Sequence, residues 1–224
     1  MFDIRPLGPG DLDLVLDLQE RIRSSLADQD IFQPSTPEFI AYCLTDGGNC
    51  YGVTHGSRTV AYRMVYFPRE RDFNLAKDTS LPPSEHTRVG HWDTIAVLPE
   101  WRGHGLARLM NTRALADLAD SDIRHLFATS SPKNPHGVRS LLEAGFRPVE
   151  LVRKFGGKLR FLFYRPALTG WTTAPAGGTD RVVDLSDITA LEDAFHDGWT
   201  GIRVIRDERE GAQLVMRRQA LPFV

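Results

Sequence analysis

Two glycines that flank a histidine, Gly103 and Gly105, mark the stretch of sequence whose residue types indicate chemistry. The surrounding pattern predicts a strand before this turn and a helix from about Gly105 onward. Glycine has no side-chain bulk, so its backbone N–H can approach an anion closely. Amides at a helix N-terminus lack partners and lie at the positive end of the helix dipole. With the fixed charge of Arg102 at the entrance, the turn is typical of a pyrophosphate-binding site.

Spacing disfavours two common nucleotide-binding loops at this turn. A Walker-type loop needs Gly-Lys-Ser/Thr at the helix start, whereas this chain has Gly105-Leu106-Ala107. A dinucleotide fingerprint needs a third glycine at the position of Arg108. The turn also follows a predicted hairpin in the middle of the chain, not an opening strand–helix–strand unit.

The same stretch resembles the coenzyme-A signature of the GNAT superfamily of N-acetyltransferases, Arg/Gln-x-x-Gly-x-Gly/Ala, through Arg102, Gly105 and Ala107. Further similarity lies in the run 95–101, in Asn134, in Gly145-Phe146 and in the order of elements over 2–164. The resemblance implies an α/β (α+β) GNAT fold, with a mixed, mostly antiparallel central sheet flanked by helices. It also implies acetyl-CoA as the acyl-donor substrate.

The resemblance assigns the donor contacts residue by residue. Pantetheine would lie against the backbone of β-strand residues Ile95, Ala96 and Val97, and Asn134 would bind pantetheine or a bridging water. Arg102 and the amides of Gly103, His104, Gly105, Leu106 and Ala107 would hold the pyrophosphate. A backbone N–H where the strands ending at 97 and 129 splay apart would stabilise the oxyanion.

An amine with a pKa of about 8–10 is mostly protonated at neutral pH, so its acylation benefits from a base. Asp93 is the first candidate, because a strand predicted over 89–97 places it in register with Ile95 and Val97. His91 shares that face and is the second candidate. The alternative is that both side chains only hydrogen-bond loop backbone.

The general acid is the open point of the resemblance. The family often places a tyrosine seven residues after the asparagine, and this chain has Leu141 there. Ser131 and Tyr164 are the candidates for the acid in its place. A thiolate, whose conjugate acid has a pKa of about 8.5, is a tolerable leaving group without an acid.

A basic hairpin is predicted over 148–154 and 159–164, with its turn at Gly156-Gly157. Its Lys158 and Arg160 are candidates for binding an anionic acceptor, such as a carboxylate or phosphate. The alternative is a solvated basic surface without a ligand.

Hydrophobic periodicity predicts strands at 2–5, 50–54, 59–67, 89–97 and 123–129, and helices from about 11, 36, 105 and 136. We expect a GNAT domain over 1–168, a Thr/Gly/Ala/Pro-rich linker over 169–180, and a small β-α-β-β extension over 181–224. Ser186 is the expected cap of the extension's helix. The extension is too small to be an independent enzyme domain and would pack on the main domain or on a second subunit of a homodimer.

Composition narrows the remaining possibilities. The net charge of −2 argues against a general nucleic-acid binder, and no apolar run is long enough to span a bilayer. The two cysteines, Cys43 and Cys50, indicate reduced thiols in a cytoplasmic protein, and no metal-ligand spacing is present.

The function expected from the whole pattern is acetyl transfer from acetyl-CoA to a primary amine of a small molecule, an amino acid or metabolite, with an anionic acceptor included. The amine would attack directly, since no nucleophile signature is present. Two alternatives stay open: a different donor (a longer acyl-CoA or an aminoacyl-tRNA), or a non-catalytic CoA-binding regulatory module.

Overall fold

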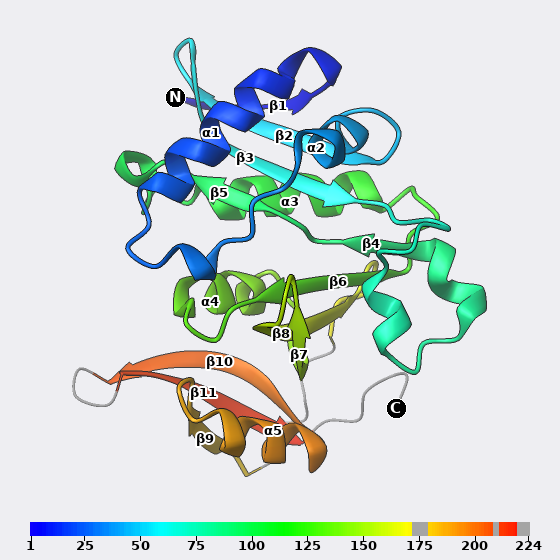
Figure 1. Ribbon diagram of the computed structural model, residues 1–224, viewed down its shortest axis with the longest axis vertical. Helices are drawn as coiled ribbons and strands as arrows, with labels where there is room; N and C mark the ends of the chain where they lie inside the picture. Colours follow the sequence, from blue (N-terminus) through cyan, green and yellow to red (C-terminus); the bar gives the residue numbers. More distant parts are fainter. Residues whose placement is uncertain (172–178, 208–210, 219–224) are drawn as a thin grey trace.

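A computed structural model describes residues 1–171, 179–207 and 211–218 of the 224-residue chain (Figure 1). Its main sheet follows the order β1-β2-β3-β4-β6-β8-β7, and β5 pairs with β3 beside β4. The strands are β1 (Phe2–Leu7), β2 (Gly48–His55), β3 (Arg58–Tyr66), β4 (Val89–His91), β5 (Ile95–Val97), β6 (His125–Ser130), β7 (Arg147–Lys154) and β8 (Lys158–Pro166). The β4–β6 pair is parallel and the other pairs are antiparallel. This confirms the predicted mixed, mostly antiparallel sheet.

Helices cover both faces of this sheet. The helices are α1 (Leu12–Ser24), α2 (Pro37–Cys43), α3 (Leu106–Leu118) and α4 (Pro135–Glu143), with short 3-10 turns at Pro9–Asp11, Gln29–Ile31 and Pro99–Trp101. Successive residues of β2 point to opposite faces: Cys50 Sγ contacts the Cys43 carbonyl of α2 at 3.4 Å, whereas the Tyr51 hydroxyl donates to Asp117 of α3 at 2.9 Å. Helices α2 and α3 therefore lie on opposite sides of the sheet.

The segment 68–88, predicted as a long polar loop, contains two 3-10 helices, η3 (Leu75–Asp78) and η4 (Pro83–Arg88). Its Leu75, Ala76 and Leu81 are buried and pack in one cluster with Phe127 and Tyr164 of β6 and β8. These apolar side chains fix the segment against β6 and β8. In Figure 1 the short helices of the segment lie beside β4.

The strand predicted over 89–97 is wrong as a single element. Strand β4 ends at His91 and pairs with β6, and the Trp92 N–H donates to the Phe127 carbonyl at 2.6 Å. Strand β5 begins at Ile95 and pairs with β3. Strand β3 is a neighbour of both β4 and β5, because His91 also pairs with Tyr66. Over 92–94 the chain therefore keeps β3 beside it and loses β6, and the sheet splits between β5 and β6. The apolar alternation of the sequence does not reveal which neighbour each half of such a run will join.

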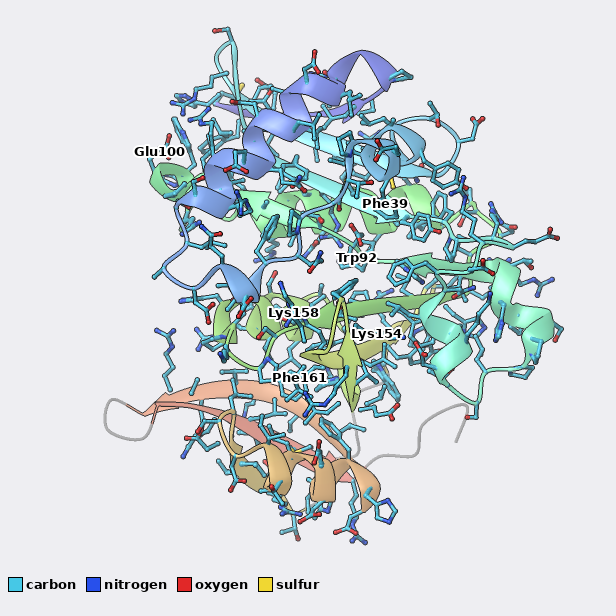
Figure 2. All side chains as sticks on the ribbon, in the orientation of Figure 1. Phe39, Trp92, Glu100, Lys154, Lys158 and Phe161 are labelled. Carbon is cyan, nitrogen blue, oxygen red and sulfur yellow. The ribbon has the colours of Figure 1, made fainter. Side chains whose placement is uncertain are left out.

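A β-α-β-β unit follows the main sheet: β9 (Arg181–Asp184), α5 (Ile188–His196), β10 (Trp199–Asp207) and β11 (Gly211–Arg218), in the sheet order β10-β11-β9. Its residues share a buried cluster with α4 and β8, and Phe195 lies 6.0 Å from Phe161 between ring centroids (Figure 2). A Cβ on Gly201 would lie 2.6 Å from the Pro148 ring, so β10 passes β7 closely. In this structure the unit packs on the main domain.

Ser186 does not cap α5 as predicted. The Asp187 side chain accepts from the Ala190 N–H at 3.0 Å, whereas the Ser186 hydroxyl donates to Asp184 at 2.6 Å. The Asp187 carboxylate, one residue closer to the helix than Ser186, accepts the hydrogen bond from the free Ala190 N–H. Most of the predicted linker (172–178) and the turn 208–210 lie outside the described residues, and the domain division stays a prediction. No helix in the described ranges is long and apolar enough to cross a membrane.

Candidate functional site

A cavity of about 540 Å³ occupies the split between β5 and β6. It is lined by segments from both sides of the sheet: the stretch 31–36 and Phe39 from the α2 side, and Asn111, Asn134 and Leu141 from α3 and α4. The split itself contributes Trp92, Asp93, Thr94, Ile95, Thr129 and Ser130. Figure 2 shows Trp92 near the centre of the molecule, below Phe39 of α2. The cavity therefore connects the two faces of the sheet through the gap.

The glycine turn takes the form that the sequence predicts. Gly103 and Gly105 have φ angles of 81° and 73°, and α3 begins at Leu106. A Cβ at either glycine would meet no atom within 4 Å, so there is room for a larger side chain at both positions. Glycine is required there because of the positive φ angles. Within the described chain, the backbone N–H groups of 103–107 make no hydrogen bond. They are free to bind an anion.

Two side chains brace this turn from within. Arg102 Nε donates to the Val97 carbonyl at 3.3 Å, and His104 Nδ1 lies 3.2 Å from the Trp101 carbonyl. Both are exposed, so the guanidinium of Arg102 keeps donors for a ligand. The turn is joined to the cavity through α3, because Asn111 lies on the same helix and lines the cavity.

Strand β5 has one free edge. Ile95, Ala96 and Val97 pair with Arg63, Tyr62 and Ala61 of β3, and no described strand pairs with them on the side of β6. Ile95 lines the cavity. An open edge presents backbone donors and acceptors to an extended arm. The three predicted pantetheine contacts thus lie where such an arm could bind.

Asp93 lies in the cavity wall and is partly buried. Burial raises the pKa of its carboxyl, while a hydrogen bond from the Thr94 hydroxyl (3.1 Å) and the charge of Arg63 act in the opposite direction. A raised pKa makes the carboxylate a stronger base, as proton removal from an amine requires.

His91 lies elsewhere. It is buried, its Nε2 accepts from the Leu75 N–H at 3.0 Å, and it does not line the cavity. Burial, aided by the charge of Lys154, lowers its pKa to about 3, so the ring stays neutral. Of the two candidates, only Asp93 faces the cavity. His91 holds the start of η3 in place.

The two candidates for the acid also lie outside the cavity wall. Ser131 Oγ accepts from the Lys133 N–H at 3.3 Å, and the Tyr164 hydroxyl lies 3.1 Å from His125 Nδ1. Residues with a hydroxyl that do line the cavity on this side include Thr129, Ser130 and Ser140. Sequence reasoning proposed none of them as the acid, since none stands in a motif.

Asn134 lines the cavity at the N-terminus of α4. Its Oδ1 accepts from the Gly137 N–H at 3.0 Å, which caps the helix and leaves the amide nitrogen for another partner. Leu141 also lines the cavity, so an apolar side chain stands where the family's tyrosine was expected.

The basic hairpin is divided between the cavity and the surface. Arg160 lines the cavity, is 4% exposed, and donates to the Asp30 carbonyl at 2.7 Å. Lys158 is absent from the cavity wall and pairs with the Asp30 carboxylate at 3.5 Å. Lys154, beside it in Figure 2, pairs with Asp78. Of the two basic candidates, Lys158 and Arg160, the structure brings only Arg160 to the cavity wall.

Arg63 is the main residue that sequence reasoning missed. It is 0% exposed, lines the cavity, and places its Cζ 3.8 Å from the centre of a Trp92 ring. Its Nε and Nη2 are buried without a hydrogen-bond partner, and burial lowers its pKa to about 9. The signal was available, because an arginine interrupts the apolar run 60–66. Periodicity alone could not connect it to Asp93.

A family model described as "Acetyltransferase (GNAT) family" matches residues 16–146. No curated protein matches the chain at a significant level. The fold is similar to that of Arabidopsis thaliana NAA60, solved with a bisubstrate analogue, at a TM-score of 0.58 and 16% identity over 76% of this chain and 100% of that one. The ribosomal-protein-S18-alanine N-acetyltransferase of Escherichia coli is similar at a TM-score of 0.57 and 14% identity, over 78% of this chain and 99% of that one. Diaminobutyrate acetyltransferase of Paenibacillus lautus, solved with its substrate and coenzyme A, is similar at a TM-score of 0.54 and 14% identity, over 77% of this chain and 99% of that one.

Proposed function

The chain belongs to the GNAT family of acetyltransferases, and from that premise we propose that it transfers an acetyl group from acetyl-CoA to a primary amine of a small molecule. The observation that carries the proposal is the cavity at the split between β5 and β6. It is lined by α3 and α4 residues on one face and by α2 and the stretch 31–36 on the other. A donor entering from one face and an acceptor entering from the other would meet beside Asp93.

The donor half of the proposal uses the turn before α3 and the free edge of β5. Amides 103–107 and Arg102 would hold the pyrophosphate, since they are unpaired donors at a helix start. Pantetheine would extend β5 along Ile95 to Val97, with the Asn134 amide as a further donor. Acetyl-CoA would supply the acyl group and carry away the electron pair of the broken C–S bond as a thiolate.

The chemistry at the split follows from Asp93. Its carboxylate would take the proton of the amine as nitrogen attacks the thioester carbonyl. A backbone N–H at the split would stabilise the oxyanion of the tetrahedral intermediate. Collapse of that intermediate forms the amide and expels the thiolate. Since Leu141 supplies no proton, the thiolate would leave unprotonated, as its conjugate-acid pKa of about 8.5 allows.

The proposal is tested by measuring thiol release from acetyl-CoA over a panel of primary amines, together with the melting temperature in the presence of acetyl-CoA. We expect turnover and a melting temperature that rises with ligand concentration. No rise at millimolar acetyl-CoA would count against the donor. A rise without turnover on any amine would favour the alternative of a non-catalytic CoA-binding module, which the apolar Leu141 motivates. Turnover only with longer acyl-CoA esters would favour the other alternative.

The compartment is part of the same proposal. Cys43 and Cys50 are both free and buried, and burial raises the pKa of both thiols. Free thiols fit a reducing compartment such as the cytoplasm.

A further inference from the structure

Four aromatic rings from separate segments form one wall of the cavity. Phe39 of α2 lies 4.8 Å from Tyr66 of β3, Tyr66 lies 6.3 Å from Phe73, and Phe73 lies 6.1 Å from Phe155, between ring centroids. All four line the cavity. Phe73 is 38% exposed, although full burial of a phenylalanine side chain would stabilise the folded protein more. The wall offers flat apolar contact area at the α2 side of the site.

Phe155 reaches this wall at a cost in backbone energy. Its φ is 51°, in the left-handed region that bulky residues rarely adopt. It stands at the tip of the β7–β8 hairpin, next to Gly156. A glycine in place of Phe155 would adopt the same conformation without strain. A strained backbone conformation persists only where the surrounding structure enforces it, and such residues cluster at functional sites. Here the strained residue places the Phe155 ring in the cavity wall.

The charges around the cavity are predominantly positive. The ionisable side chains in its wall, apart from Tyr66, are Arg63, Arg71, Arg160 and Asp93, which sum to three positive charges against one negative. Arg71 is exposed, lies over the Tyr42 ring at 3.6 Å, and has no described carboxylate within ion-pair distance. Its N–H donors are free for an anion.

Arg160 forms no ion pair with any described carboxylate, and the charges of Asp30 and Asp28 reach it only through space. Its guanidinium donates to two backbone carbonyls, of Leu159 at 2.9 Å and of Asp30 at 2.7 Å, and neither carries a charge. The nearby carboxylates are already paired with lysines: Asp30 with Lys158 at 3.5 Å, and Asp28 with Lys133 at 3.8 Å.

We infer that the acceptor is a primary amine that carries both a carboxylate and a flat apolar body such as an aromatic ring. The inference rests on the proposed function and specifies its substrate class. The ring would lie against Phe39, Phe73 and Phe155, the carboxylate would bind Arg71 and Arg160, and the amine would face Asp93. The excess positive charge disfavours polyamines, because each additional ammonium would enter against repulsion.

The test uses two pairs of amines that differ only in the carboxylate: L-phenylalanine with 2-phenylethylamine, and 4-(aminomethyl)benzoate with benzylamine. Binding to the full-length protein is measured by calorimetry, alone and with CoA. We expect at least one carboxylate member to bind roughly ten- to hundred-fold more tightly than its partner, as for a charge-assisted hydrogen bond. Equal affinity within both pairs, no binding of any member, or tighter binding of spermidine would each overturn the inference.

Variants separate the two elements of recognition. Arg71→Gln should weaken the carboxylate member by about ten-fold and leave its partner unchanged. Phe155→Gly should weaken both members of a pair without lowering the melting temperature, because glycine relieves the backbone strain. Arg153→Gln is the matched control, since Arg153 is exposed on the same hairpin and does not line the cavity. If Arg153→Gln matches Arg71→Gln, the effect is general surface charge and the inference is wrong.

These outcomes are distinguishable from failure of the proposed function. Binding measures the acceptor site without catalysis, whereas thiol release and stabilisation by acetyl-CoA measure the donor site and turnover. Selective binding of the carboxylate amines without thiol release would refute the acetyl transfer and retain the acceptor class. Thiol release only with amines that lack a carboxylate would retain the acetyl transfer and refute the acceptor class.

Discussion

Replacing Arg63 with methionine should make the protein more stable and less active. Arg63 is 0% exposed, its Nε and Nη2 have no partner, and no described carboxylate lies within ion-pair distance of it. The charge of Asp93 acts on it only through space. Methionine is unbranched and adaptable, so it can fill the same channel beside Trp92 without a charge.

The size of the effect follows from the buried charge. Burial lowers the pKa of this guanidinium from 12.5 to about 9. At about 1.4 kcal/mol per factor of ten, carrying the charge costs the folded state roughly 5 kcal/mol at neutral pH. The Trp92 face, 3.8 Å away, returns about 1–2 kcal/mol, and apolar replacement of buried charge typically gains about 1–4 kcal/mol. The difference leaves an expected gain of about 3–4 kcal/mol for Arg63→Met, a rise in melting temperature of roughly 6–16 °C.

Activity should move in the opposite direction. The Arg63 charge favours the ionised form of Asp93, so its loss should raise the pKa of Asp93 further. The base is active only when ionised, and the acid limb of the kcat/KM profile should shift to higher pH. Urea unfolding and a pH–rate profile measure the two effects on one preparation. A melting temperature several degrees below wild type would show that Arg63 is satisfied in the fold and would refute the reasoning.

Three further predictions concern the turn, the base and the C-terminal unit. Gly105→Ala forces a side chain onto φ 73° and should weaken acetyl-CoA binding, measured by calorimetry. The control is Gly198→Ala, at φ 78° between α5 and β10, which should cost similar stability and leave that affinity unchanged. Asp93→Asn should lower kcat by about 100-fold or more and remove the acid limb of the pH profile, which lies above the usual carboxyl range because burial raises the Asp93 pKa. Unchanged kcat across pH would remove Asp93 from the mechanism. Asp187→Ala should cost about 1 kcal/mol in urea unfolding through loss of the α5 cap, and a larger loss for Ser186→Ala would contradict the assignment.

The sequence by itself determined the glycine turn that we propose binds the donor. Two glycines before an apolar helix specify a turn with positive φ and free amides, and these are local properties of a few consecutive residues. The family was equally accessible, because the spacing from Arg102 to Ala107 is a short-range pattern. The alternation of apolar residues located most strands and helices within a few residues, since side-chain period depends on backbone conformation alone.

Only the tertiary structure decided the composition of the cavity that we propose binds the acceptor. Whether 89–97 forms one strand or two depends on its neighbours, which come from distant parts of the chain: β3 and β6 both pair with His91, whereas only β3 pairs with Ile95. The wall of Phe39, Tyr66, Phe73 and Phe155 likewise joins four segments that no spacing relates. Burial of Arg63 near Asp93 is a consequence of packing, and burial shifts both pKa values. The order of residues in a sequence carries the conformational preference of each short segment. The desolvation of Arg63 and Asp93 and the short distance between their charges exist only once the chain has folded.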